Sequence, residues 1–124
     1  MEYKFTVPGR LDGLNEYTSA NRTNPYKGGK MKKDNEETVI WSIRQQLRGL
    51  HINCPVTLKY TFYEKNKRRD LDNISSFAHK VIQDSLVKTG ILKNDGWNEI
   101  VGFRDSFAVD KDNPRIEVTL EEAE

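Results

Sequence analysis

Residues 56–63 read VTLKYTFY, and their alternating apolar and polar side chains have the two-residue period of a half-buried strand. Residues 67–74 then read KRRDLDNI. This segment leads into a helical stripe of apolar residues, namely Ile74, Phe77, Ala78, Val81, Ile82 and Leu86. Gly90 is positioned to end that helix. The sequence therefore predicts a strand and a helix that are joined by the KRRDLDNI segment.

The KRRDLDNI segment sets three basic side chains directly against two carboxylates that are one residue apart. The basic side chains can hold a polyanionic backbone, whereas Asp70 and Asp72 can bind a hard divalent cation through oxygen. A further acid, Asp95, lies downstream in a turn. The pattern indicates metal-assisted cleavage of a phosphodiester. The alternative is that Asp72 or Asn73 only caps the following helix and that the basic run is a solvated surface.

The remaining elements complete the order β-α-β-α-β-β. Further strands are predicted at residues 3–7, 101–109 and 116–120. Asp34 and Glu37 have capping-box spacing and begin a helix that runs to Gly49. We therefore expect a single α+β domain over residues 1–124, with its helices packed on a small mixed β-sheet.

Residues 12–33 are predicted to form a long loop. They are rich in Asn, Thr, Gly and Lys and contain Asn24-Pro25 and Gly28-Gly29, which are typical of turns. Their basic content favours a DNA-facing loop that becomes ordered on binding. A plain mobile loop is the alternative.

The formal net charge of +1 at pH 7 conceals a segregation of charge. The candidate DNA-binding residues form two blocks, with Lys27, Lys30, Lys32 and Lys33 in the first and Lys65, Lys67, Arg68 and Arg69 in the second. Acidic residues gather at the C-terminus. A near-neutral total is therefore compatible with one positive face, which suits nucleic acid better than a membrane.

The single cysteine, Cys54, excludes an intramolecular disulfide and a multi-cysteine zinc site, and we expect it in a buried strand. No apolar run is long enough for a signal peptide or a membrane span. We therefore expect a soluble cytoplasmic protein without a membrane partner. Trp41 and Trp97 are expected to be core or interface anchors, because large aromatic residues usually serve packing.

The run Arg68–Asn73, the helix after it and residues 90–95, which read GILKND, together resemble the RusA family of Holliday-junction resolvases. The likeness is most specific over residues 68–100. It implies a small homodimeric endonuclease, often carried by phages and prophages, that acts in DNA recombination and repair. Such an enzyme would cut four-way DNA junctions with paired nicks and would depend on Mg²⁺, with Mn²⁺ as an alternative cation.

The resemblance also implies which residues form the site. The acid-x-acid-Asn motif of the family falls on Asp70, Asp72 and Asn73, and its later acid falls on Asp95. The three acids would be catalytic metal ligands. Asn73 would orient a ligand carboxylate or cap the helix, and Glu99 would substitute for or supplement Asp95.

The catalytic lysine of the family falls on Lys80 when the helix is counted back from its end. It falls on Ser76 when the helix is counted forward from Asp72, and His79 is a third candidate. A lysine here could stabilise the scissile phosphate or the leaving oxygen, because a cation aimed at developing negative charge lowers the barrier. The alternative role of Lys80 is an ordinary i,i+4 ion pair with Asp84.

Two other functions compete with a junction resolvase. One is a branch- or flap-cutting nuclease that has the same site and prefers a different substrate. The other is a non-catalytic DNA-binding structural protein. The three acids argue against a pure binder, because carboxylates close to phosphate weaken DNA binding when no cation is present.

Overall fold

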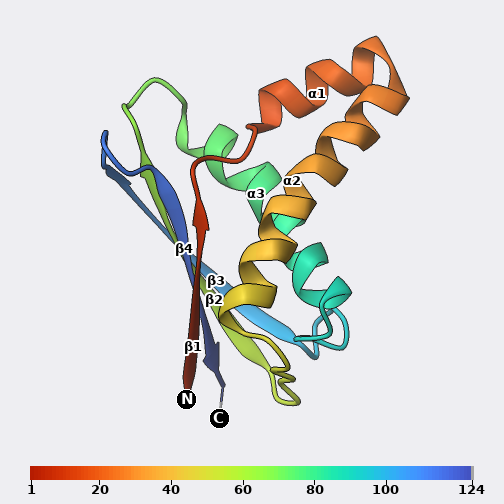
Figure 1. Ribbon diagram of the computed structural model, residues 1–124, viewed down its shortest axis with the longest axis vertical. Coiled ribbons are helices and arrows are strands. Elements are labelled where there is room, and N and C mark those ends of the chain that lie inside the picture. The colour runs from red at the N-terminus through yellow and green to blue at the C-terminus, as the bar shows by residue number, and fades with distance from the viewer. Residues whose placement is uncertain (124) are drawn as a thin grey trace.

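Four strands form one mixed sheet, and three helices cover one of its faces in the computed structural model, which describes residues 1–123 (Figure 1). The elements in chain order are β1 (Glu2–Pro8), α1 (Leu14–Thr23), α2 (Pro25–Gln46), β2 (Val56–Glu64), α3 (Leu71–Lys88), β3 (Ile100–Val109) and β4 (Arg115–Glu122). The predicted α+β class is confirmed. No helix in residues 1–123 is long and apolar enough to cross a membrane.

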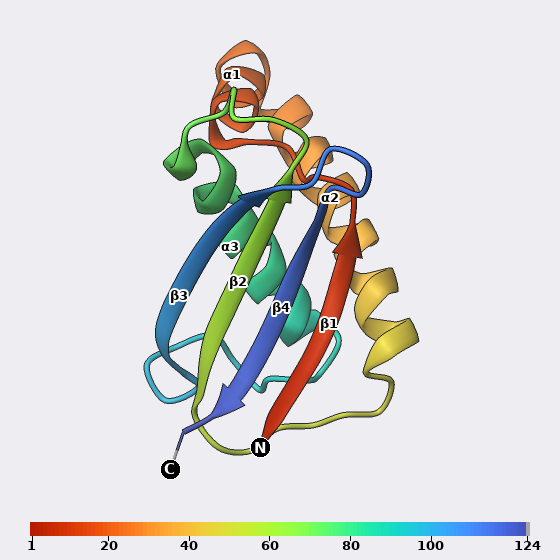
Figure 2. The ribbon, with the colours of Figure 1, turned by 90° about the vertical axis from the view of Figure 1, so that its left-hand side faces the viewer.

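The strand order across the sheet is β1-β4-β2-β3 (Figure 2). β4 pairs antiparallel with β1 and β2, whereas β2 and β3 run parallel, with Val56 opposite Ile100 and Glu64 opposite Val109. α3 must therefore cross back over the sheet to connect β2 with β3. As a result, the β2–α3 connection and the turn before β3 lie at opposite ends of the molecule (Figures 1 and 2).

The core lies between the sheet and the helix layer. β2 buries every second residue, as its sequence period predicts, and α3 covers these side chains with its apolar stripe. The central core residues are Phe5, Val7, Val56, Leu58, Tyr60, Phe62, Phe77, Val81, Ile82, Leu86, Val118 and Leu120. This packing holds the N-terminal end of α3 against the end of β2.

The prediction of a loop over residues 12–33 is wrong. Gly13 is the N-cap of α1, and Asn24 accepts a hydrogen bond from the Tyr26 amide, with Pro25 as the first residue of α2. Gly28 and Gly29 lie inside α2, near its start. α2 therefore begins before Asp34, and the element order contains one more helix than predicted. The polar composition was misleading, because Ala20 is the only buried residue among the ten residues of α1.

Cys54 also differs from its prediction, because it precedes β2 and is only partly buried. The two tryptophans are not core residues, since Trp41 is 60% exposed and Trp97 is 96% exposed. Tyr17, which lay in the predicted loop, stacks on Phe77 with 4.4 Å between the ring centroids. It therefore packs the helix layer together.

Candidate functional site

Asp70 and Asp72 lie at the start of α3 with both carboxylates exposed to solvent. Asp70 occupies the N-cap position, yet its side chain makes no capping hydrogen bond. Within residues 1–123, neither carboxylate takes part in a hydrogen bond or an ion pair. The alternative in which Asp72 only caps its helix therefore has no support, and both acids have oxygen atoms available for a cation.

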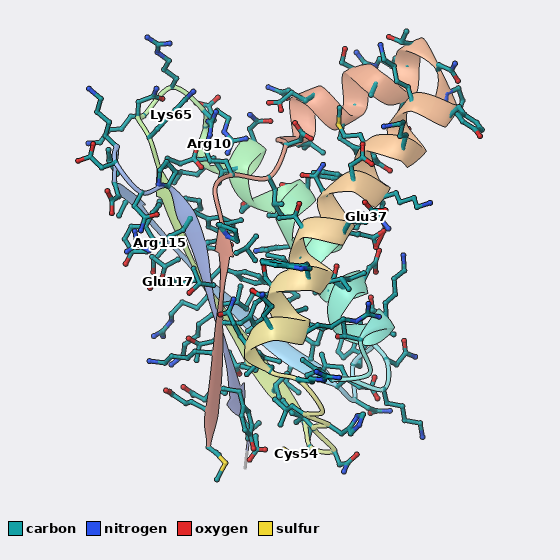
Figure 3. The ribbon with its side chains drawn as sticks, in the orientation of Figure 1. Arg10, Glu37, Cys54, Lys65, Arg115 and Glu117 are labelled. Carbon is teal, nitrogen blue, oxygen red and sulfur yellow. The ribbon has the colours of Figure 1, made fainter. Side chains whose placement is uncertain are left out.

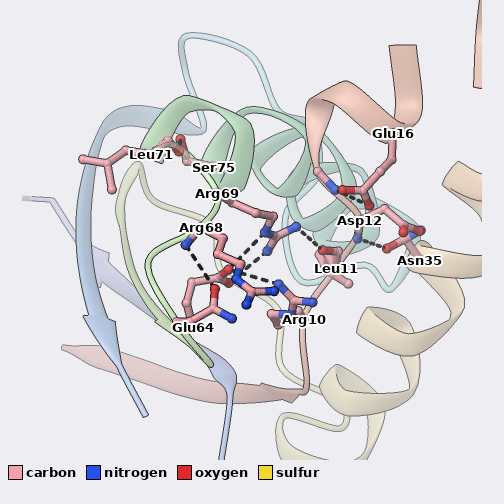
Figure 4. A network of polar contacts seen from close by, with 12 residues as sticks. Arg10, Leu11, Asp12, Glu16, Asn35, Glu64, Arg68, Arg69, Leu71 and Ser75 are labelled. Atoms are coloured by element: carbon pink, nitrogen blue, oxygen red, sulfur yellow. Dashed lines mark hydrogen bonds and ion pairs between the residues drawn. The ribbon is translucent and has the colours of Figure 1, made fainter. Parts of the chain in front are cut away.

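An ion cluster around the buried Glu64 carboxylate fixes the backbone just before Asp70 (Figure 4). Glu64, which is 6% exposed, accepts two hydrogen bonds from Arg69, one at 3.0 Å from Nε and one at 2.9 Å from Nη2. Arg69 Nη1 also donates to the Leu11 carbonyl at 3.1 Å, and Arg10 lies 3.4 Å from the same carboxylate. Such bidentate pairing holds the guanidinium in one geometry. Arg69, predicted to bind DNA, thus serves here to position the acidic motif.

Sequence reasoning missed this cluster, although one signal was present. Glu64 continues the inward-facing phase of β2 that includes Tyr60 and Phe62. An acid on the buried face of a strand needs a cationic partner, because an unpaired buried charge is costly. The adjacent basic run supplies that partner.

Asn73 connects α3 to α1. Its Oδ1 accepts a hydrogen bond from the Asn15 amide at 2.7 Å, at the start of α1. A Cβ atom on Gly13 would lie 2.8 Å from the Asn73 side chain, so this close approach requires glycine. The Asn73 oxygen therefore caps the start of the neighbouring helix α1 and does not cap its own helix.

The β2–α3 connection carries the exposed basic residues Lys65, Lys67 and Arg68. Figure 3 shows Lys65 at one end of the sheet. The Arg68 amide donates to Asn66 Oδ1 at 3.0 Å, which orders the turn. No ion pair within residues 1–123 engages these three side chains. They remain available for phosphate, on the same connection as Asp70.

The first basic block lies on α2 instead of a loop. Lys27, Lys30 and Lys33 are exposed, and Lys30 pairs with Asp34 at 3.0 Å. Lys32 is different, because its ammonium lies 2.7 Å from Asp84 on α3 and 3.5 Å from Glu36. Burial lowers the pKa of Lys32, but the contacts with these two carboxylates outweigh burial and raise it overall. Lys32, predicted to bind DNA, ties α2 to α3.

The three candidates for the catalytic position, Ser76, His79 and Lys80, have different surroundings on α3. His79 turns toward the sheet, where its Nε2 lies 2.8 Å from Asp105 and its ring packs on Tyr60 at 4.6 Å. Ser76 and Lys80 are exposed. Lys80 forms no ion pair within residues 1–123, since Asp84 pairs with Lys32. The alternative of a Lys80–Asp84 pair is therefore wrong.

Asp95 lies in the turn before β3, at the other end of α3 from Asp70. α3 has 18 residues and spans about 27 Å. In the same turn, Glu99 accepts a hydrogen bond from the Gly96 amide at 3.2 Å. No group of three or more acids, histidines or cysteines in residues 1–123 is placed to hold a metal ion. One chain therefore does not bring Asp95 to Asp70 and Asp72.

Asp70 opens onto a groove between α3 and β3 with a volume of about 850 Å³. Lys67 and Asp105 also line it, but several of its walls are apolar side chains, namely Leu71, Ile74, Phe107 and Val109. The groove thus combines carboxylates and cations with apolar walls. It can therefore accept a macromolecular surface as well as a small polar group.

Two comparisons with known proteins identify the family to which the sequence is similar. The family model described as endodeoxyribonuclease RusA matches residues 14–121. The crossover junction endodeoxyribonuclease RusA of Aquifex aeolicus (strain VF5) is 34% identical over 82 residues, which cover 61% of this chain and 62% of that protein. The match thus spans a little over three-fifths of the length of that relative.

Proposed function

The chain belongs to the endodeoxyribonuclease RusA family, and from this premise we propose that it is a Mg²⁺-dependent endonuclease that cuts four-way DNA junctions in recombination and repair. The observation that carries the proposal is the pair of unengaged carboxylates, Asp70 and Asp72, beside the exposed Lys67 and Arg68. Acids in a phosphate-binding surface repel the backbone unless a cation lies between them. Asp70 is the N-cap residue of α3 and Asp72 lies in its first turn, so both acids stand on one regular element, as a cleavage site requires.

The donor set fits a hard cation. Asp70, Asp72 and Asp95 offer exposed carboxylate oxygens, which Mg²⁺ prefers, and Mn²⁺ accepts the same ligands. When bound, the cation would activate a water and offset charge on the phosphate. Glu99 keeps one oxygen free of the turn hydrogen bond and would supplement Asp95.

Lys80 would stabilise the reacting phosphate. It lies two turns beyond Asp72, about 12 Å along the helix axis. Helical side chains lean toward the N-terminus, so the long lysine side chain covers part of this distance. Its ammonium has no internal partner in the described residues and would meet negative charge that develops at the scissile group.

The separation of Asp95 from the other acids leads us to propose a homodimer with shared sites. In a two-fold pair, Asp95 of each copy would join Asp70 and Asp72 of the other copy. Two such sites match a four-way junction, which is itself close to two-fold symmetric, and would cut two opposed strands.

Phosphate contacts would come from exposed cations only. Lys65, Lys67 and Arg68 lie on the same connection as the acids, and Lys27, Lys30 and Lys33 lie on α2. These contacts would position the DNA without reading its sequence.

The test is incubation of labelled four-way junction, flap and linear duplex with and without Mg²⁺. We expect paired incisions in the junction only when the cation is present. Preference for the flap would assign the chain to the branch-cutting nucleases, and binding without any cleavage would make it a structural DNA-binding protein.

Shared sites are tested with mixed dimers of Asp72→Asn and Asp95→Asn chains. Each variant alone should be inactive, because both of its sites lack one acid. The mixed dimer should regain single nicks, since one of its sites contains only native acids. Absence of activity in the mixture would refute the shared arrangement.

A further inference from the structure

A second groove lies between the last turn of α2 and the segment that follows α3, with a volume of about 600 Å³. The C-terminal ends of these two helices lie at the same end of the molecule (Figure 1). Asp70 stands at the opposite end of α3, which has 18 residues and spans about 27 Å. The second groove is therefore remote from the cations and acids of the β2–α3 connection.

The floor of this second groove is aliphatic. Ile43 and Ile91 line it as buried core residues, and Leu47 beside them is partly buried. Thr89 also lines the groove, but its hydroxyl donates to the Ser85 carbonyl at 2.8 Å. The floor therefore suits an apolar side chain, whereas a nucleobase would bring polar edges that find few partners there.

The rim of the second groove carries one aromatic side chain and two cations. Trp41 is 60% exposed, and Arg44 and Arg48 are exposed and form no ion pair within residues 1–123. Among the described residues, no acid lines the groove, and the sequence from 38 to 63 contains neither Asp nor Glu. The groove thus has a positive rim around an apolar floor.

This composition is typical of a contact with another protein. Tryptophan and arginine are enriched at the centres of protein interfaces, where they dominate the binding energy, whereas lysine is depleted. No lysine lines the second groove within the described residues, while Lys65 and Lys67 stand beside the acidic motif. Arginine also binds a carboxylate through two parallel hydrogen bonds. The partner that complements this groove is therefore acidic.

We propose that the second groove binds an acidic peptide segment of another protein. One large apolar side chain of the segment would pack on Ile43 and Ile91, and its carboxylates would pair with Arg44 and Arg48. This role goes beyond the proposed nuclease function and does not require it. Because Asp70 lies at the other end of α3, a bound segment would leave the acidic motif free for DNA.

Selection from a library of displayed random peptides tests this groove without DNA or cation. The wild-type chain should enrich short peptides that place acids next to a leucine, isoleucine or phenylalanine. As synthetic peptides, these should bind the Arg44→Glu, Arg48→Glu chain at least about 30-fold more weakly than wild type. Arg44→Gln with Arg48→Gln should weaken binding in the same direction without added acids, and circular dichroism checks that each variant is folded. Failure to enrich peptides, or enrichment of peptides without acids, would overturn the proposal.

The matched control is the Lys65→Glu, Lys67→Glu chain. It makes the same change of net charge at the other end of the molecule, far beyond the screening length of about 8 Å at physiological salt. The selected peptides should therefore bind it within about 2-fold of wild type. Equal weakening in the arginine and lysine variants would reduce the effect to net charge and overturn the proposal.

Tryptophan fluorescence locates the bound peptide. In a Trp97→Phe chain, Trp41 is the sole tryptophan, and its emission should shift to the blue as a selected peptide covers it. Trp41→Ala should weaken peptide binding about 10-fold or more. Unchanged emission at saturating peptide would place the peptide elsewhere and overturn the proposal.

Single-stranded DNA is the competing occupant, because tryptophan and arginine can also stack on bases. Titrations with oligothymidylate and with a four-way junction at about 0.15 M salt separate the two occupants. The Arg44→Glu, Arg48→Glu chain should bind both nucleic acids as wild type does, whereas the Lys65→Glu, Lys67→Glu chain should bind them more weakly. Weaker binding of either nucleic acid by the arginine variant would make the groove a DNA contact and overturn the proposal.

These measurements separate the peptide groove from the nuclease function. Wild-type protein that binds selected peptides through Arg44 and Arg48 but cuts no DNA would refute the nuclease proposal and support the peptide groove. Junction cleavage by wild-type protein, together with peptide binding that ignores both arginines, would refute the peptide groove and leave the nuclease proposal standing.

Discussion

Replacing Arg69 with alanine should destabilise the fold, although the residue lies in a run that resembles a DNA-binding patch. The change removes both hydrogen bonds that Arg69 makes to the buried Glu64 carboxylate and the one that it makes to the Leu11 carbonyl. Breaking a buried ion pair typically costs about 3–5 kcal/mol. Arg10, at 3.4 Å, continues to compensate part of the charge. We therefore expect a loss at the low end of that range, about 3 kcal/mol.

Urea unfolding followed by far-UV circular dichroism measures this loss as a lower midpoint at an unchanged m-value. The melting temperature should fall by about 10 °C for a domain of this size. The matched control is Arg68→Ala, since the neighbouring Arg68 is exposed and forms no internal ion pair within residues 1–123. Its stability should stay within about 0.5 kcal/mol of wild type.

DNA binding, in contrast to stability, should depend on Arg68 and not on Arg69. Arg68→Ala should reduce the slope of log K against log salt by about 1, because one phosphate contact is lost. Arg69→Ala, assayed well below its melting temperature, should keep the wild-type slope. If Arg69→Ala were as stable as Arg68→Ala and lost the same salt slope, the assignment of Arg69 to the buried cluster would be refuted.

Asp72→Asn should abolish cleavage in Mg²⁺ while junction binding stays intact or tightens, because the change removes a cation ligand and a repulsive charge; single-turnover assays and binding titrations measure the two effects. Lys80→Ala should slow single-turnover cleavage about 100-fold or more at unchanged junction affinity, and an unchanged rate would exclude Lys80 from the site. Gly13→Ala should cost about 1–3 kcal/mol in urea unfolding, because the new Cβ would lie 2.8 Å from the Asn73 side chain. The Arg115 guanidinium lowers the pKa of Asp110, so this carboxylate stabilises the fold above its unfolded pKa of about 3.9 and loses that effect as pH falls through its folded pKa. Stability of Asp110→Asn should therefore fall less than that of wild type on acidification below about pH 4, as acid titrations of both proteins will show.

The elements with strong periodicity were predictable from sequence. β2 and α3 bury one face each, and a buried face imposes its period on the chain. α1 and the first part of α2 were not predictable in this way, because α1 buries only Ala20, Gly13 and Pro25 lie at helix starts, and Gly28 and Gly29 are tolerated inside α2. Helix capping and a loop use the same residue types, so composition alone could not separate them.

Part of the candidate site was likewise predictable from sequence, and part was not. The Asp70-Leu71-Asp72 motif is local, and its place between a strand and a helix follows from sequence. The location of Asp95 depends on the parallel pairing of β2 and β3, which no local pattern encodes. The internal roles of Arg69, Lys32 and Asn73 likewise depend on partners that are distant in the sequence.

The parallel pairing of β2 and β3 also bears on how the protein behaves in a cell. Because α3 keeps Asp95 apart from Asp70 and Asp72, a newly made chain that meets no second copy cannot assemble the full acid set. In the shared-site homodimer that we propose, the number of complete sites would rise with the square of the number of chains when copies are scarce. Cleavage by such a dimer would therefore be weak at low expression and would rise more steeply than the number of chains.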